Sequence, residues 1–150
     1  MSIPAVLVIL HIIFATLWFG GPLMAAGTLK KTAAAGPKAF VAGADLANRM
    51  GTQAVVGTVG VLLTGVGLIF TVYGGMGGLP VRFHVALTLA LVANIIGFGF
   101  LKPTLGSIVK AAAAPDFDPA SVAGSMKKVG MFSGINHLLW LVALVLMYAV

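Results

Sequence analysis

Residues 3–29 read IPAVLVILHIIFATLWFGGPLMAAGTL, and this run contains no lysine, arginine, aspartate or glutamate. A helix needs about 20 consecutive apolar residues to cross the hydrocarbon core of a bilayer. The run is therefore long enough for one membrane-spanning helix. No basic residue precedes it, and it is longer than the apolar region of a signal peptide. We expect a transmembrane helix that is retained in the protein.

Three further apolar runs follow, at residues 51–73, 81–101 and 129–150. The chain is 60% hydrophobic and only 8% charged, whereas soluble domains carry about 25% charged residues. The short connections between the runs favour antiparallel neighbours. We predict an all-α integral membrane protein, a four-helix up-down-up-down bundle that forms one transmembrane domain over residues 1–150.

The basic residues indicate an orientation. Residues 30–50 contain four of the nine lysines and arginines, residues 102–128 contain another four, and Arg82 is the ninth. Cytoplasmic connections carry an excess of basic residues, so both termini are expected on the non-cytoplasmic side of a bacterial-type inner membrane. The net charge of +6 then indicates contact with anionic lipid headgroups rather than with nucleic acid.

The residues available for chemistry are few. The four runs contain no acidic residue and the chain has no cysteine, which excludes paired-carboxylate catalysis and thiolate metal sites. Each of the three histidines, His11, His84 and His137, falls in an apolar run. An ionisable residue inside a membrane span is by default a functional-site hypothesis, and a neutral imidazole is the form that binds a metal.

The histidines can be placed in depth from a rise of about 1.5 Å per residue. His11 then lies about 12 Å below the start of its helix, and His137 lies about 20 Å from the end of its own. With ordinary helix tilt these two could share a level and ligate one haem. His84 lies nearer the surface, where it suits a second site, a propionate contact or a tilted haem.

Aromatic and small residues accompany these histidines. Trp18 follows His11 on one helical face and Trp140 follows His137 on another, so both are candidate cofactor contacts as well as packing residues. Gly57, Gly60, Thr64 and Gly67 form a stripe of small residues. Such residues let helices approach closely in lipid, and they would alternatively leave room for a flat ligand.

Several short blocks of the sequence resemble a known family. They are residues 10–14 (LHIIF), 18–21 (WFGG), 48–50 (NRM), 64–65 (TG) and 82–85 (RFHV). They resemble the first three helices of the HemJ-type protoporphyrinogen oxidases, small haem-binding membrane proteins similar in architecture to the CopD-like copper-resistance proteins. The resemblance covers about the first two-thirds of the chain.

The resemblance implies haem binding at His11 and at His84. It does not extend to His137. The family has a lysine two residues after its third-helix histidine, where this chain has Ala86, and residues 25–28 replace the family's Pro-Arg segment. The implied haem-dependent oxidoreductase activity is therefore not carried over, and no catalytic residue is assigned.

The leading hypothesis is a small membrane protein that binds haem b through histidine and serves electron transfer or redox chemistry. A quinone, a porphyrin or a membrane redox protein would be its partner. One alternative is a copper-handling or transport protein that uses the same histidines, with His84 and Met76 as a possible copper site. The other is an accessory subunit whose histidines only bond between helices. The long apolar perimeter also indicates a homo-oligomer.

Overall fold

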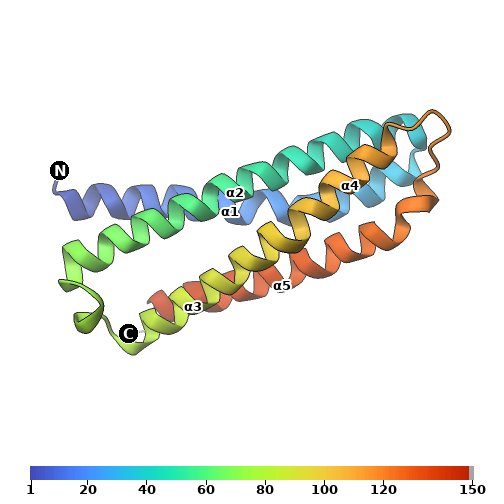
Figure 1. The fold of residues 1–150 in the computed structure, drawn as a ribbon. Coiled ribbons are helices and arrows are strands. Elements are labelled where there is room, and N and C mark those ends of the chain that lie inside the picture. Colours follow the sequence, from blue (N-terminus) through green and yellow to red (C-terminus); the bar gives the residue numbers. More distant parts are fainter. Residues whose placement is uncertain (149–150) are drawn as a thin grey trace.

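The computed structural model describes residues 1–148 and shows four long helices, each apolar enough to cross a membrane, with no strand in that part of the chain. Figure 1 shows their arrangement. The elements are α1 (Ile3–Ala34), α2 (Pro37–Tyr73), η1 (Met76–Gly78), α3 (Val81–Ile96), the π-helical turn η2 (Gly97–Leu101), α4 (Lys102–Ala112), η3 (Pro119–Val122) and α5 (Ala123–Tyr148). The predicted all-α four-helix membrane bundle is confirmed. Residues 149–150 of the expected fourth span lie outside the described residues.

The helices extend beyond the apolar runs. Residues 30–50 were expected to form a polar connection, but only the turn at Ala35 and Gly36 separates α1 from α2. Gly36 adopts a φ of 100° and Pro37 occupies the first helical position, where its missing N–H costs nothing. With 37 residues, α2 is about 56 Å long, which exceeds the bilayer core of about 30 Å. Much of the basic first connection is therefore helical.

Glycines allow α1 and α2 to pack with their backbones in contact. A methyl group on Gly21 would lie 2.6 Å from the carbonyl oxygen of Met50, and one on Gly57 would overlap the backbone of Trp18. Gly60 faces the ring of Phe14. The predicted close approach of helices is confirmed. The alternative of a flat ligand at Gly60 is not supported, because the side chain of Phe14 fills that space.

The bundle is well packed at one end only. We call the end with the α1–α2 turn and residues 113–118 the lysine end, and the opposite end the termini end. The largest fully buried side chains lie toward the lysine end and include Phe40, Leu29, Leu105 and Ile108. No residue in 1–17 is buried.

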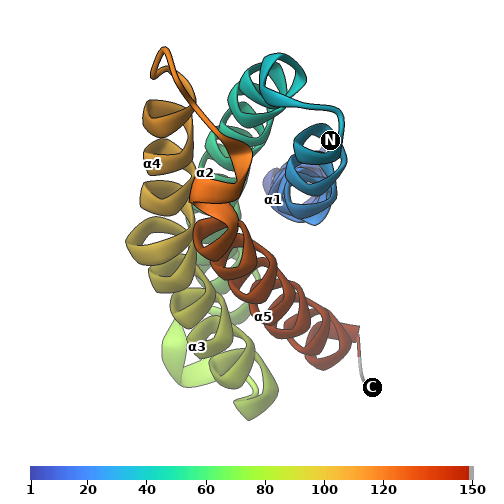
Figure 2. The same ribbon diagram turned by 90° about the vertical axis from the view of Figure 1, so that its right-hand side faces the viewer.

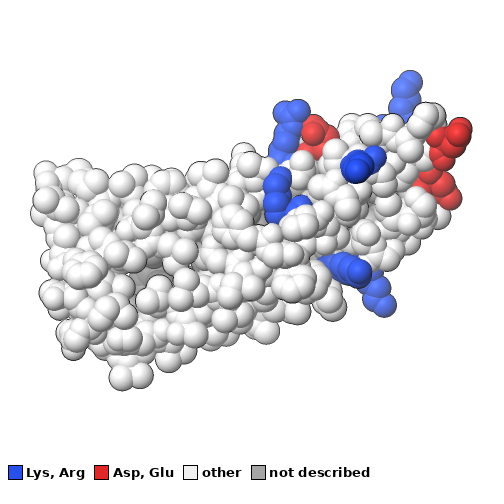
Figure 3. Space-filling view, in the orientation of Figure 1, with Lys and Arg blue, Asp and Glu red and all other residues white. Residues whose placement is uncertain are grey.

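The termini end is open because the helices diverge. The pairs α1/α2 and α3/α5 each pack closely, whereas α2 and α3 make few contacts. Figures 1 and 2 show the two pairs separating toward the termini end. In Figure 3 the surface is hollowed between them at that end, and the charged residues on this face gather toward the lysine end.

Lys102 marks the boundary between the two regions. Its ammonium group donates hydrogen bonds to Oδ1 of Asn48 at 2.7 Å, to the Asn48 carbonyl at 3.2 Å and to the Thr52 hydroxyl at 2.7 Å. These bonds fasten the start of α4 to α2. They satisfy the charge with neutral acceptors, where the apolar part of the bundle begins.

Candidate functional site

His11 is held in one tautomer by α2. Its Nδ1 lies 2.9 Å from the hydroxyl oxygen of Thr64, and this hydroxyl donates to the carbonyl of Gly60 at 2.6 Å. The hydroxyl proton is thus already used, so Nδ1–H of His11 is the donor and the Thr64 oxygen accepts. Nε2 then carries the lone pair. Gly65 lies beside the imidazole, and a Cβ there would be 3.4 Å from its Cε1, an ordinary van der Waals contact.

His137 bridges two helices. Its Nδ1 lies 2.6 Å from the Ser133 carbonyl of its own helix, and its Nε2 lies 3.0 Å from the Phe19 carbonyl on α1. Its ring also meets the Phe19 ring edge-on, with centroids 5.0 Å apart. Both ring nitrogens therefore face carbonyl oxygens, and neither presents a free lone pair to a metal.

The structure does not bring His11 and His137 together. His137 contacts Phe19, which lies eight residues beyond His11 and so about 12 Å farther along α1. The residue count had suggested that the two rings could share a level. They lie at different levels because α5 packs beside the middle of α1 rather than beside its first turns.

His84 lies in the first turn of α3, close to the glycine-rich turn at residues 74–80. Its Nδ1 is 3.4 Å from the carbonyl oxygen of Pro80, and its side chain is half-buried. Met76, the proposed copper partner, is exposed in η1. In the described residues, no group of three histidine, cysteine, aspartate or glutamate side chains is placed to hold a metal ion.

The two tryptophans have different surroundings. The ring of Trp140 is half-buried and lies 4.4 Å from that of Phe19 between centroids, next to His137. Trp18 is only 5% exposed and belongs to a small core with Ala54, Val61, Ala90 and Ala93. Neither set of contacts includes His11. The two tryptophans and His11 therefore do not line one common cofactor site in this structure.

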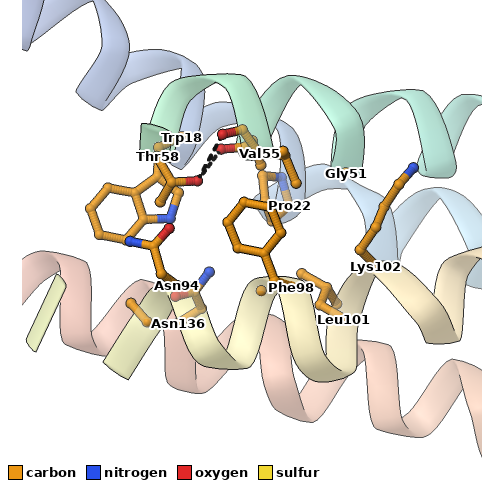
Figure 4. Close-up of a pocket in the computed structure, with 13 residues that line it drawn as sticks. Trp18, Pro22, Gly51, Val55, Thr58, Asn94, Phe98, Leu101, Lys102 and Asn136 are labelled. Atoms are coloured by element: carbon orange, nitrogen blue, oxygen red, sulfur yellow. Dashed lines mark hydrogen bonds between the residues drawn. The ribbon is translucent and has the colours of Figure 1, made fainter. Parts of the chain in front are cut away.

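A cavity with a few polar side chains in a mostly apolar lining lies in the middle of the bundle, and sequence reasoning missed it. Thr58 of α2, Asn94 of α3 and Asn136 of α5 line it together with Trp18 and Pro22 of α1. Figure 4 shows these side chains between the helices. The signal in the sequence was an amide residue in each of two apolar runs, Asn94 and Asn136, because a buried amide needs hydrogen-bond partners.

The structure therefore contains an oriented imidazole at His11, an interhelical hydrogen bond at His137 and a separate cavity between them and the lysine end. The resemblance to HemJ-type and CopD-like proteins stays a prediction. No family model, no curated protein and no solved structure matches this chain.

Proposed function

We propose that this chain is a small membrane protein that binds a b-type haem through His11 and serves electron transfer within the bilayer. The observation that carries the proposal is the bond from His11 Nδ1 to Thr64. A metal-binding histidine generally donates its other ring N–H to an acceptor, which fixes the tautomer and the ring orientation. The Thr64 hydroxyl supplies this acceptor, and Nε2 is the nitrogen that would ligate the iron.

The packing of the termini end supports the same proposal. A flat apolar macrocycle needs space between helices, and the two helix pairs diverge at the end of the bundle where His11 lies (Figures 1 and 3). For the second axial position, His84 is the better candidate of the two remaining histidines. Its Nδ1 makes only a long contact with Pro80, whereas both nitrogens of His137 face carbonyls.

In this proposal the haem supplies one-electron redox chemistry. The protein would hold the iron through His11 and would orient the imidazole through the Thr64 hydroxyl. The electron donor or acceptor would be a quinone or another membrane redox partner that reaches the termini end through the lipid. The copper-handling alternative uses the same histidines, but Met76 of its possible His84–Met76 site is exposed, and no observation favours that site over haem binding at His11.

An absorption spectrum tests the proposal. The protein is expressed with excess haem, purified in detergent, and measured oxidised and dithionite-reduced. A Soret band with haem bound in stoichiometric amount is expected in the wild type, and its loss is expected in His11→Ala. Circular dichroism of the variant establishes that the helices remain. A wild-type protein without a Soret band would refute haem binding.

A matched pair of threonine variants tests the role assigned to Thr64. Thr64→Val removes the acceptor of His11, and haem affinity should fall by about 10- to 100-fold. Thr71→Val is the control, because Thr71 is exposed on the same helix and its hydroxyl bonds only the Gly67 carbonyl, at 2.8 Å. Equal haem affinities in the two variants would contradict the assignment.

We also infer that the lysine end faces the cytoplasm. Eight of the nine lysines and arginines fall in residues 30–50 and 102–128, and these two segments meet at the lysine end (Figures 1 and 3). The positive-inside rule then places both termini across the membrane. Alkaline phosphatase fused after the C-terminus should be active in the periplasm, and an inactive fusion with an active cytoplasmic reporter would reverse the orientation.

A further inference from the structure

The cavity between the helix pairs contains buried acceptors without partners. Within residues 1–148, Oδ1 of Asn94 and Oδ1 of Asn136 have no hydrogen-bond partner, and these residues are only 9% and 4% exposed. The orientation of Asn94 is fixed, because its Nδ2 donates to the Ala90 carbonyl at 2.8 Å. Its oxygen is therefore the atom left for the cavity. A buried polar atom without a partner is costly, and native proteins rarely leave one unpaired.

The other polar groups of the lining include acceptors and donors: the Trp18 indole N–H, the Asn136 amide NH2 and the Lys102 ammonium group can all donate. The Thr58 hydroxyl donates to the Ala54 carbonyl at 2.5 Å, so its lone pairs remain available (Figure 4). Pro22 has no N–H, so it cannot donate to the Trp18 carbonyl one turn earlier. The unpartnered amide oxygens of Asn94 and Asn136 call for an occupant that donates hydrogen bonds or carries a positive charge.

The volume of the cavity and the charged groups in its lining indicate which ligand it can hold. The cavity has a volume of about 20 Å³, and a volume of about 10–15 Å³ is enough for one water molecule. No carboxylate lines the cavity, whereas Lys102 does. A cation would therefore meet a positive charge and no negative one. Water carries two donors and no charge, and it fits both the volume and the acceptors.

We propose that this cavity is a specific water-binding site between Asn94 of α3 and Asn136 of α5. The bound water donates one proton to Asn94 and the other to Asn136, and it thereby links α3 to α5 beside Trp18 of α1. The π-helical turn η2 supports this assignment. Gly97, Phe98 and Leu101 of this turn line the same cavity, and π-turns inserted in helices are frequent at functional sites. The inference is independent of haem binding.

Radiolytic labelling in ¹⁸O-water tests for the bound water directly. Hydroxyl radicals formed from an internal water oxidise the side chains beside it. Trp18 lines the cavity and is 5% exposed, so the label should appear there in wild-type protein. Asn94→Leu/Asn136→Leu should lose the Trp18 label, while the label on Trp140, which does not line the cavity, stays unchanged. An unlabelled Trp18 in wild-type protein would overturn the proposal.

A double-mutant cycle tests whether the two amides share one ligand. With a shared water, the effects of Asn94→Leu and Asn136→Leu on the unfolding equilibrium constant should differ from additivity by about fivefold or more. In a dry cavity no ligand couples the two amides, and each leucine alone should stabilise the protein because an unpaired oxygen is removed. Additivity would therefore overturn the proposal.

Salt substitution distinguishes water from an alkali cation. Wild-type stability is compared in sodium, potassium and N-methylglucamine chloride at equal ionic strength. A water site predicts the same stability in all three salts. A stability increase with sodium or potassium that disappears in Asn94→Leu/Asn136→Leu would show a cation site and overturn the proposal.

Discussion

The contact between α1 and α2 at Gly57 provides the sharpest test of the fold. A methyl group added to Gly57 would overlap the backbone nitrogen and Cα of Trp18 and the carbonyl oxygen of Phe14. A flexible side chain could swing away from such an overlap, but two helix backbones cannot. Gly57→Ala therefore forces α1 and α2 apart at a point where their backbones are in contact.

The expected magnitude follows from two opposing terms. Overpacking costs about 1–3 kcal/mol, and a clash with three backbone atoms belongs at the upper end of that range. Replacing glycine by alanine inside a helix stabilises the helix by about 1 kcal/mol, which opposes the overpacking cost. We expect a net loss of about 2 kcal/mol in the free energy of unfolding, which is a factor of about 30 in the unfolding equilibrium constant.

Gly20→Ala is the matched control. Gly20 lies in α1, and a methyl group there would have no atom within 4 Å. This variant should gain up to about 1 kcal/mol from helix propensity alone. Unfolding is followed by far-ultraviolet circular dichroism while sodium dodecyl sulfate is titrated into dodecyl maltoside micelles. If Gly57→Ala proves as stable as Gly20→Ala, the helices do not pack as described.

Two further predictions use the same titration. Lys102→Met removes the donor to Asn48 and Thr52 and should cost about 1.5–3 kcal/mol, whereas Lys110→Met, at an exposed position, should change stability by less than about 0.5 kcal/mol. His137→Phe removes the bond to the Phe19 carbonyl and should cost about 1 kcal/mol, yet it should keep the Soret band expected of the wild type. Loss of that band with the helices intact would assign His137 as an axial ligand instead.

The membrane-spanning helices could be predicted from the sequence, because lipid surrounds them. Residues 3–29 contain no charged side chain apart from the ionisable His11, and backbone groups in lipid can be satisfied only within a helix or a closed barrel. The same argument could not predict a helix in residues 30–50. In water, the backbone polar groups can be satisfied in a helix and in a loop equally well. There the helix is set by tertiary packing, in which Leu29 and Phe40 are fully buried in a common core.

Part of the candidate site was also predictable from residue types. A histidine in an apolar run indicated a site at His11, and the small residues of α2 indicated a close helix contact. The partner of His11 was within that stripe, because Thr64 is its only hydroxyl residue. The sequence could not show that Thr64 faces His11, since the rotation of α2 about its axis depends on how Gly57 and Gly60 meet α1.

The depth of a residue in its own helix does not give its level in the bundle. Counting from the chain ends placed His11 and His137 near one level, but that count assumes that the start of α1 and the end of α5 lie at the same height and that the two helix axes are not tilted. The bond from His137 to the Phe19 carbonyl fixes the real offset. The divergence of the helix pairs arises in the same way: Phe40, Leu105 and Ile108 fill the lysine end with large side chains, while no residue in 1–17 is buried. Burial thus concentrates the packing energy at one end and leaves the termini end free to accept a ligand, which is why His11 rather than His137 is the histidine to test first.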